Sequence, residues 1–219
     1  MMSRRNTDKV KEGRSRHVPD ERKSGREDLR AEIACRAARL IAEDGVNDFD
    51  VAKKKAARQL GVSAGTLLPD DLAVHTALKS HQAIFQQDFQ PAECHALRKI
   101  AVEVMRWLHH FSPWLVGAVL DGSANHFSHV ELEIVSDNAK LLEIFFLNEG
   151  TPFDIQIRRD GLRHATTTKR DISLYEVRFR DFPVDVALYR DHATRGGKMH
   201  ARAQLATVEL LLAADFTAP

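Results

Sequence analysis

The sequence predicts an α+β protein in which a helical N-terminal segment packs on a mixed-sheet core. Apolar residues recur at helical spacing through the first half of the chain. After Pro113 they instead alternate with polar residues or form short apolar runs, which is typical of strands. The length of 219 residues and the 43% hydrophobic content suit one soluble domain, or one domain with an appended segment, that buries a sizeable core.

Residues 1–27 are predicted to form a disordered basic tail, because they show no apolar periodicity that could offset the entropy of ordering them. They also lack the apolar stretch of a secretory signal. The longest apolar run of the chain, Trp114 to Leu120, has only seven residues, too few to span a membrane. We therefore expect a cytoplasmic protein. Cys35 and Cys94 are isolated, which favours two buried, inert thiols over a disulfide or a zinc site.

Residues 28–94 are predicted to be the helical segment. Apolar residues from Leu29 onward repeat every three to four positions, and Gly45 is placed to end that helix. Further helices are expected over residues 49–60, after Pro69, and over residues 91–110, the last of which leads into the core.

Residues 95–219 are predicted to be an α/β core with four to five strands. A buried strand is expected over residues 114–120 and a second over residues 129–135. The remaining expected elements are a helix over 138–148, a strand over 153–157, strands over 174–179 and 184–189 joined at Asp181-Phe182-Pro183, and a last helix over 199–214.

Three acidic residues of this core are candidates for chemistry. The spacing of Glu131 and Glu133 places both carboxylates on one face of a strand, close enough to share a divalent cation. Asp185 stands in an otherwise apolar strand, where a carboxylate is costly unless it is paired or bound to metal. Upstream, Gly122 and Ser123 follow the first predicted strand, where a glycine allows close backbone approach and a hydroxyl can bond a phosphate oxygen.

This pattern resembles the nucleotidyltransferase superfamily with the polymerase-β-like core, over roughly residues 95–212. It is also similar to small proteobacterial proteins of that architecture. The resemblance implies that Glu131, Glu133 and Asp185 hold magnesium or manganese ions, which position a triphosphate for attack by an acceptor hydroxyl. It also implies that Gly122 and Ser123 hold the phosphates. Only seven residues separate Ser123 from Glu131, which leaves little room for the helix that usually follows the Gly-Ser turn.

The function expected from this resemblance is metal-dependent transfer of a nucleotide from an NTP to an acceptor hydroxyl. The acidic stretch of residues 121–150 lies between basic ones, which suits RNA, for example tRNA, as the acceptor. Arg158, Arg159 and Lys198 are candidates to receive the triphosphate or the RNA backbone. The alternative is a catalytically degenerate protein of the same fold that binds nucleotide or nucleic acid.

A purely structural explanation also stays open. The Glu131 and Glu133 carboxylates could form an ordinary solvated strand face, and Asp185 could pair with Arg178 or Arg180 across the hairpin. His129 could contact phosphate or metal, or simply face solvent.

A second pattern lies in the helical segment. Residues 56–67 resemble the helix-turn-helix of TetR-like repressors, and residues 37–45 resemble the helix that precedes it. Gly61 would lie in the turn and Ser63 would cap the recognition helix. Lys53, Lys54 and Lys55 would then form a basic helix face. A TetR-like DNA-binding regulator is accordingly a further hypothesis.

Overall fold

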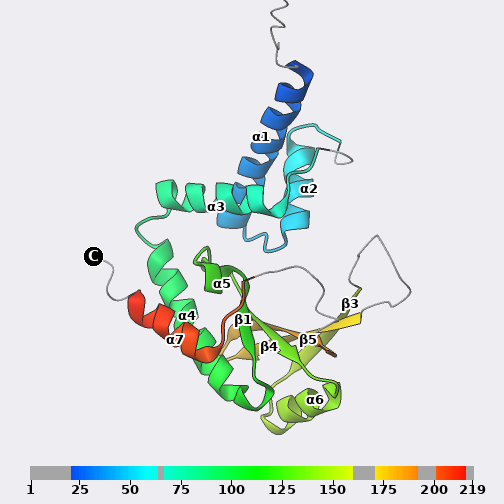
Figure 1. Cartoon of the computed structure of the whole chain (residues 1–219), viewed down its shortest axis with the longest axis vertical. Helices are drawn as coiled ribbons and strands as arrows, with labels where there is room; N and C mark the ends of the chain where they lie inside the picture. Colours follow the sequence, from blue (N-terminus) through cyan, green and yellow to red (C-terminus); the bar gives the residue numbers. More distant parts are fainter. Residues whose placement is uncertain (1–20, 64–66, 160–170, 192–200, 216–219) are drawn as a thin grey trace, which may run out of the picture.

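A computed structural model describes residues 21–63, 67–159, 171–191 and 201–215 of the chain. It shows helices concentrated in the N-terminal half and a five-stranded mixed sheet in the C-terminal half (Figure 1). The predicted α+β class is confirmed. Within the described ranges, no helix is long and apolar enough to cross a membrane.

The helical segment is built from α1 (Glu21–Asp44), α2 (Phe49–Gln59) and α3 (Asp71–Phe85). Its core consists mainly of small side chains, which allow the three helices to approach closely. Asp48 and Asp70 cap α2 and α3 by accepting hydrogen bonds from backbone amides of the first turns. The fully buried members of this core are Ile33, Ala37, Ala38, Ala52, Ala56, Ala57 and Val74.

The first helix is longer than the sequence indicated. It begins at Glu21, so the expectation of disorder up to residue 27 is wrong for residues 21–27, while residues 1–20 lie outside the described part. Residues 25–28 are exposed, and a helix turn that buries nothing gives no apolar signal. Arg and Glu nevertheless have high helix propensity, which supports an extension from the buried turns that follow.

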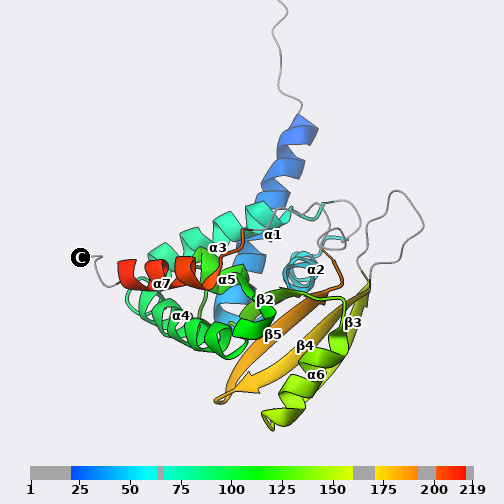
Figure 2. The ribbon, with the colours of Figure 1, turned by 60° about the horizontal axis from the view of Figure 1, so that its bottom comes forward.

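The sheet has the strand order β1-β2-β5-β4-β3, in which only β2 and β5 run parallel. Helices α4 and α6 pack on the same core and contact each other through Trp107, Phe145 and Phe146, and α7 lies along α4 (Figure 2). The elements are α4 (Gln90–Trp107), β1 (Trp114–Val116), α5 (Gly117–Asp121), β2 (Val130–Val135), α6 (Ala139–Asn148), β3 (Phe153–Arg159), β4 (Asp171–Phe179), β5 (Phe182–Tyr189) and α7 (Leu205–Ala214).

One face of the sheet forms the second core. Leu132 and Ile134 of β2 and Val186 of β5 are buried there with Phe146 of α6 and Met105 of α4. Burial on the scale of these side chains stabilises a fold by roughly 1.5–3 kcal/mol for each residue. This core holds β2 and β5 rigidly, so it also positions the residues that alternate with it on the opposite face.

Two local predictions are corrected. The strand expected over residues 114–120 ends at Val116, because Gly117 takes a φ of +71° and starts α5. The hairpin turn lies at Arg180 and Asp181, with φ values of 47° and 70°, and not at residues 181–183. The apolar run through residue 120 was misleading, since a short buried helix and a buried strand are equally apolar.

The two cysteines also differ from expectation. Cys94 is buried, as predicted, and burial raises the pKa of its thiol. Cys35 is exposed, so the prediction that both thiols are buried is wrong for this residue. It lies on the side of α1 that faces away from the helical core.

Candidate functional site

Four carboxylates cross the open face of the sheet in a single row. Glu131 of β2 pairs in register with Asp185 of β5, Asp185 pairs with Glu176 of β4, and Glu176 pairs with Asp154 of β3. Residues paired in this way lie about 5 Å apart and point to the same side of a sheet. We call these four residues the acidic row. The structure thus places Glu131 and Asp185 next to each other on one face of the sheet.

Glu133 lies on the same face but in a different setting. It pairs with Ala187 and Trp114, two positions along β2 from the acidic row, and it is only 7% exposed. The guanidinium of Arg202 lies 4.1 Å from the centre of the Trp114 ring and covers this edge of the sheet. Glu131 is exposed and Glu133 is buried, so the two glutamates are not equivalent.

Gly117 allows the Glu131 carboxylate to lie against the backbone at the start of α5. A Cβ atom at position 117 would lie 2.7 Å from both Cδ and Oε1 of Glu131. No side chain fits in that space, and the φ of +71° also favours glycine. Sequence reasoning missed this residue. The available signal was a glycine immediately after an apolar strand, fourteen positions before Glu131.

His129 bonds to Asp185. Its Nδ1 lies 3.0 Å from Oδ2 of Asp185, and the two side chains are 36% and 25% exposed. The hydrogen bond with Asp185 raises the pKa of His129 above its ordinary value, while partial burial opposes that rise. The charges of Asp185, Glu131 and Glu176 raise the pKa further. The sequence analysis considered His129 as a contact for phosphate or metal, but not as a partner of Asp185.

The purely structural alternative paired Asp185 with Arg178 or Arg180. The described contacts contain neither ion pair. The guanidinium of Arg180 bonds instead to Glu103 of α4. Arg178 is exposed and pairs in register with Pro183, two positions along the hairpin from the pair of Glu176 and Asp185. The partner that the structure gives Asp185 is a histidine, whose charge depends on pH.

Gly122 and Ser123 lie where the sheet unit meets the helical segment. Ser123 is 3% exposed, and its carbonyl accepts a hydrogen bond of 2.7 Å from the Gln82 side chain. Its amide donates to Oδ1 of Asp121 and to the carbonyl of Ala118. The Gln90 side chain donates to the carbonyls of Gly122 and Ala124. The described contacts of this turn are thus with α3, α4 and α5.

This placement explains the short spacing before Glu131. The glycine that ends a strand and precedes a helix is Gly117, whereas Gly122 comes after that helix. The backbone amide of Ser123 already donates to Asp121 and to the carbonyl of Ala118, so a phosphate oxygen could accept from it only by displacing these partners. A phosphate role for Gly122 and Ser123 stays a prediction.

The three basic candidates are placed only in part. The backbones of Arg158 and Arg159 pair with Ile172 and Asp171 in the edge strand β3, but their side chains lie outside what the structure describes. Lys198 lies wholly outside the described residues. Their expected contact with a triphosphate therefore stays a prediction.

The carboxylates fit a magnesium or manganese site in donor type and in strand position. Hard divalent cations prefer carboxylate oxygens, and Glu131 and Asp185 face the same side of adjacent strands. The Glu131 carboxylate lies against Gly117, and Asp185 bonds to His129. Among the described residues, no group of three or more His, Cys, Asp or Glu is arranged to hold a metal ion. The bond to His129 uses Oδ2 of Asp185, which leaves Oδ1 for a cation.

The helix-turn-helix pattern is only partly matched. Helix α2 and a turn at Gly61 are present, but residues 67–70 are not helical and the next helix is capped by Asp70, not by Ser63. Residues 64–66 lie outside the described part. The predicted basic face is also reduced, because the Lys53 ammonium is buried between Asp50 and Asp71 at 2.8 and 2.7 Å.

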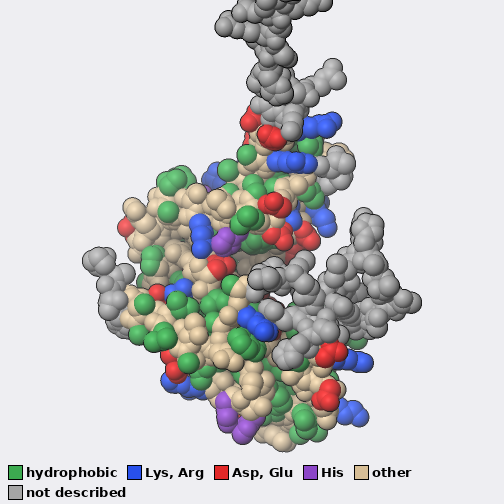
Figure 3. Space-filling view, viewed as in Figure 1, with side chains coloured by type: hydrophobic (Ala, Val, Ile, Leu, Met, Phe, Trp, Pro, Cys, Tyr) green, Lys and Arg blue, Asp and Glu red, His purple; other side chains and the backbone are tan. Residues whose placement is uncertain are grey.

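Acidic and basic side chains are mixed over α1 and α2 on the face shown in Figure 3. Lys55, for example, is paired with Asp44 at 3.2 Å. Duplex DNA favours a patch of uncompensated positive charge, and the described residues of α1 and α2 form none on the face in this view.

Comparisons with known proteins add no relative to this description. No protein-family model matches the chain, and no match was found among curated proteins.

Proposed function

We propose that this protein is a metal-dependent nucleotidyltransferase that moves a nucleotide from an NTP to an acceptor hydroxyl, with RNA as the acceptor, in the cytoplasm. The observation that carries the proposal is the in-register pairing of Glu131 with Asp185 on the open face of two parallel strands. Two carboxylates from adjacent rigid strands form the minimum arrangement for holding a hard divalent cation beside a triphosphate.

The residues of this chain have separate roles in that proposal. Glu131 and Asp185 would hold the cation, and Glu133 would contribute from the neighbouring position if its edge of the sheet opens. Gly117 leaves room for the Glu131 carboxylate against the start of α5. His129 fixes the Asp185 carboxylate through Nδ1 and partly neutralises the repulsion within the acidic row. When bound, the cation would neutralise phosphate charge and increase the nucleophilicity of the acceptor hydroxyl.

The test is incubation of the protein with each labelled NTP, magnesium or manganese, and total tRNA. Label should pass to the RNA with the wild type, and Asp185→Asn should reduce transfer by at least a hundredfold. Asp154→Asn is the matched control, because Asp154 lies on the same face at the far end of the acidic row. Transfer that survives Asp185→Asn, or that falls equally with Asp154→Asn, would contradict the assignment.

A second candidate is a protein that binds nucleotide or nucleic acid without transferring it. The burial of Glu133 favours this candidate, because it withdraws one of the three predicted carboxylates from a cation. Equilibrium dialysis against labelled NTP separates the two functions. Binding without label transfer under any metal condition supports the second candidate over the first.

A further inference from the structure

A pocket, separate from the acidic row, lies at the end of the sheet where the β4–β5 hairpin meets α4. It has a volume of about 530 Å³, within the usual range for small-molecule sites. We call it the hairpin pocket and define it by Trp107 and Glu103 of α4, Glu149 at the end of α6, and Arg178, Phe179 and Arg180 of the hairpin. None of these residues belongs to the acidic row.

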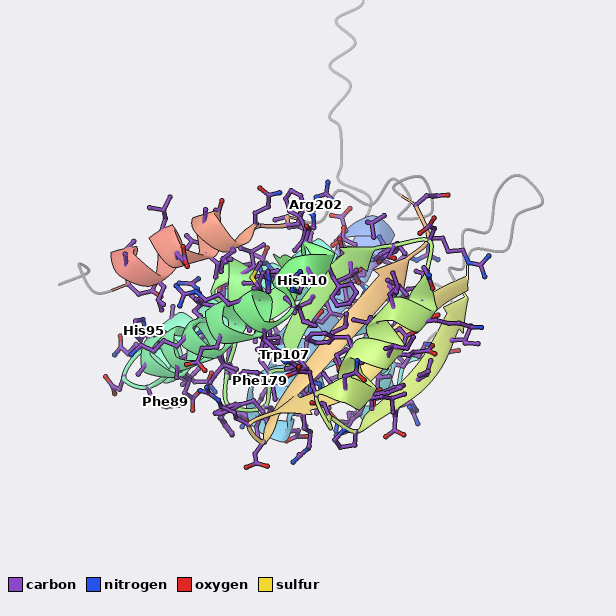
Figure 4. The ribbon with its side chains drawn as sticks, turned by 90° about the horizontal axis from the view of Figure 1, so that it is seen from below. Phe89, His95, Trp107, His110, Phe179 and Arg202 are labelled. Carbon is purple, nitrogen blue, oxygen red and sulfur yellow. The ribbon has the colours of Figure 1, made fainter. Side chains whose placement is uncertain are left out.

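The aromatic part of the pocket is rigid. The Trp107 and Phe179 rings lie 5.3 Å apart, and Trp107 also contacts Phe145 and Phe146 at 5.1 and 5.7 Å. Trp107 donates from Nε1 to Oε2 of Glu149 at 3.0 Å, which fixes the plane of the indole. Figure 4 shows Trp107 and Phe179 next to each other, from α4 and from the hairpin. A partly exposed, immobile indole is a suitable surface for stacking a planar ring.

The hairpin turn places arginine where glycine or asparagine is usual. Arg180 has a φ of 47° at the first position of a two-residue turn, and a non-glycine residue there costs about 1 kcal/mol or more. In return, its guanidinium bonds to Glu103 and lies 5.3 Å from the centre of the Phe179 ring. The turn thus holds a cation against the aromatic part of the pocket, at the expense of local stability.

The charges of the pocket select the ligand. Arg180 is paired with Glu103, and Arg106 at the rim is paired with Glu209 at 2.6 Å. Arg178 also lines the pocket, and the described residues offer it no ionic partner. Because Arg178 alternates with Phe179 along β4, its side chain starts on the face of the acidic row and has to reach the pocket around the end of the hairpin. One free guanidinium suits one phosphate group. The carboxylate of Glu149, which has no arginine partner among the described contacts, would repel a polyanion such as a triphosphate. Both glutamates can accept hydrogen bonds from hydroxyl or amino groups.

We propose that the hairpin pocket binds a single nucleotide unit, with the base on Trp107 and Phe179, the phosphate on Arg178, and hydroxyl or amino groups of the nucleotide at the two glutamates. This unit is either a free nucleoside monophosphate or one nucleotide of a single-stranded RNA. The proposal goes beyond nucleotidyl transfer and does not depend on it, because the pocket needs no metal and no member of the acidic row.

The test uses Trp107 fluorescence in the full-length Trp114→Phe protein, where Trp107 is the sole tryptophan. The protein is titrated in EDTA with adenosine 5′-monophosphate, adenosine, inorganic phosphate and a six-nucleotide riboadenylate. Saturable quenching is expected from the monophosphate, from the oligonucleotide, or from both. Adenosine should bind at least tenfold more weakly than the better of the two, and phosphate alone should not quench.

Variants decide whether the binding belongs to this pocket. Arg178→Gln should weaken binding at least tenfold and Arg178→Lys less, because lysine keeps the charge but loses the planar fork. Arg190→Gln, which removes one exposed arginine beyond the other end of β5, should leave binding unchanged. Melting temperatures of all variants should stay close to that of the parent. Asp185→Asn should keep the quenching, so a failure of the transferase assignment and a failure of this site are distinguishable.

Comparison of the oligonucleotide with the monophosphate shows whether the bound nucleotide is free or part of an RNA strand. Tighter binding of the oligonucleotide assigns the pocket to an RNA strand, and quenching by the monophosphate alone assigns it to a free nucleotide. Absence of saturable quenching by either, equal quenching by adenosine, or unchanged affinity in Arg178→Gln would each overturn the proposal.

Discussion

The two faces of the sheet come from the same strands but differ in burial and in charge. On one face Leu132, Ile134 and Val186 are buried beneath the helices. On the other face Glu131 and Asp185, which alternate with them, form part of the acidic row. Because side chains of a strand alternate, a step of one residue changes the role of a position from stabilising the fold to presenting charge.

Glu133 shows where this division ends. It is on the polar face by register but only 7% exposed, next to Trp114 at the β1 edge. The polar face is therefore open around Asp185 and closed toward β1. A cation or phosphate from solvent can therefore reach Glu131, which is exposed, but not Glu133, which is buried.

The largest expected effect contrasts two neighbouring residues. Leu132→Ala should lower the free energy of unfolding by about 2–5 kcal/mol, because it leaves a cavity in the core face. Glu131→Gln should change it by no more than about 0.5 kcal/mol, since the residue is exposed and the substitution relieves repulsion within the acidic row. Urea denaturation of both variants measures the contrast. Equal losses would show that the polar face also stabilises the fold.

An intermediate effect is expected at Gly117. Gly117→Ala should destabilise by about 1–3 kcal/mol from the φ of +71° alone, with a further loss from the collision with Glu131. Gly150→Ala is the matched control, because Gly150 has a φ of +64° and open space around it. Thermal melts should show the larger loss at Gly117.

The double variant Gly117→Ala with Glu131→Ala separates the two contributions. Removing the carboxylate should reduce the loss at Gly117 to that of Gly150→Ala. If Gly117→Ala and Gly150→Ala are equally destabilising from the start, the Glu131 side chain moves away from the added methyl group without cost, and the predicted collision is wrong.

Much of the fold could be predicted from local patterns. The period of two in Val130 to Val135 gave both the strand and its two faces, and the apolar stripe with Gly45 gave the end of α1. The start of α1 could not be predicted in this way, because its first turns bury nothing. The α5 helix was missed because its five residues, four of them apolar or glycine, are too few to show a helical period.

For the candidate site, strand alternation predicted the face on which each residue lies, but not which strands are neighbours. Alternation placed Glu131 and Asp185 on definite faces, but the alignment of their strands was set by tertiary pairing. Glu176 and Asp154 joined the row through the register of β3 and β4, which no local pattern contains. The same holds for the bond of His129 to Asp185, which joins residues 56 positions apart.

The smallest expected effect is the pH dependence of that bond. The pKa of His129 is raised in the folded protein above its ordinary value of 6.5, so protonated His129 stabilises the fold. This contribution is fully present below pH 6.5 and is lost as the pH rises through the raised pKa. It should amount to about 1 kcal/mol at most, because both side chains are partly exposed. In EDTA, the wild type should therefore be more stable than His129→Gln at pH 6 and equal to it at pH 9. His110→Gln, which changes an exposed histidine outside the site, should show no such convergence. A stability difference between wild type and His129→Gln that is constant from pH 6 to 9 would mean that His129 acts through packing and not through charge. In that case the acidic row would lack the neutralising partner that the proposed site assigns to it.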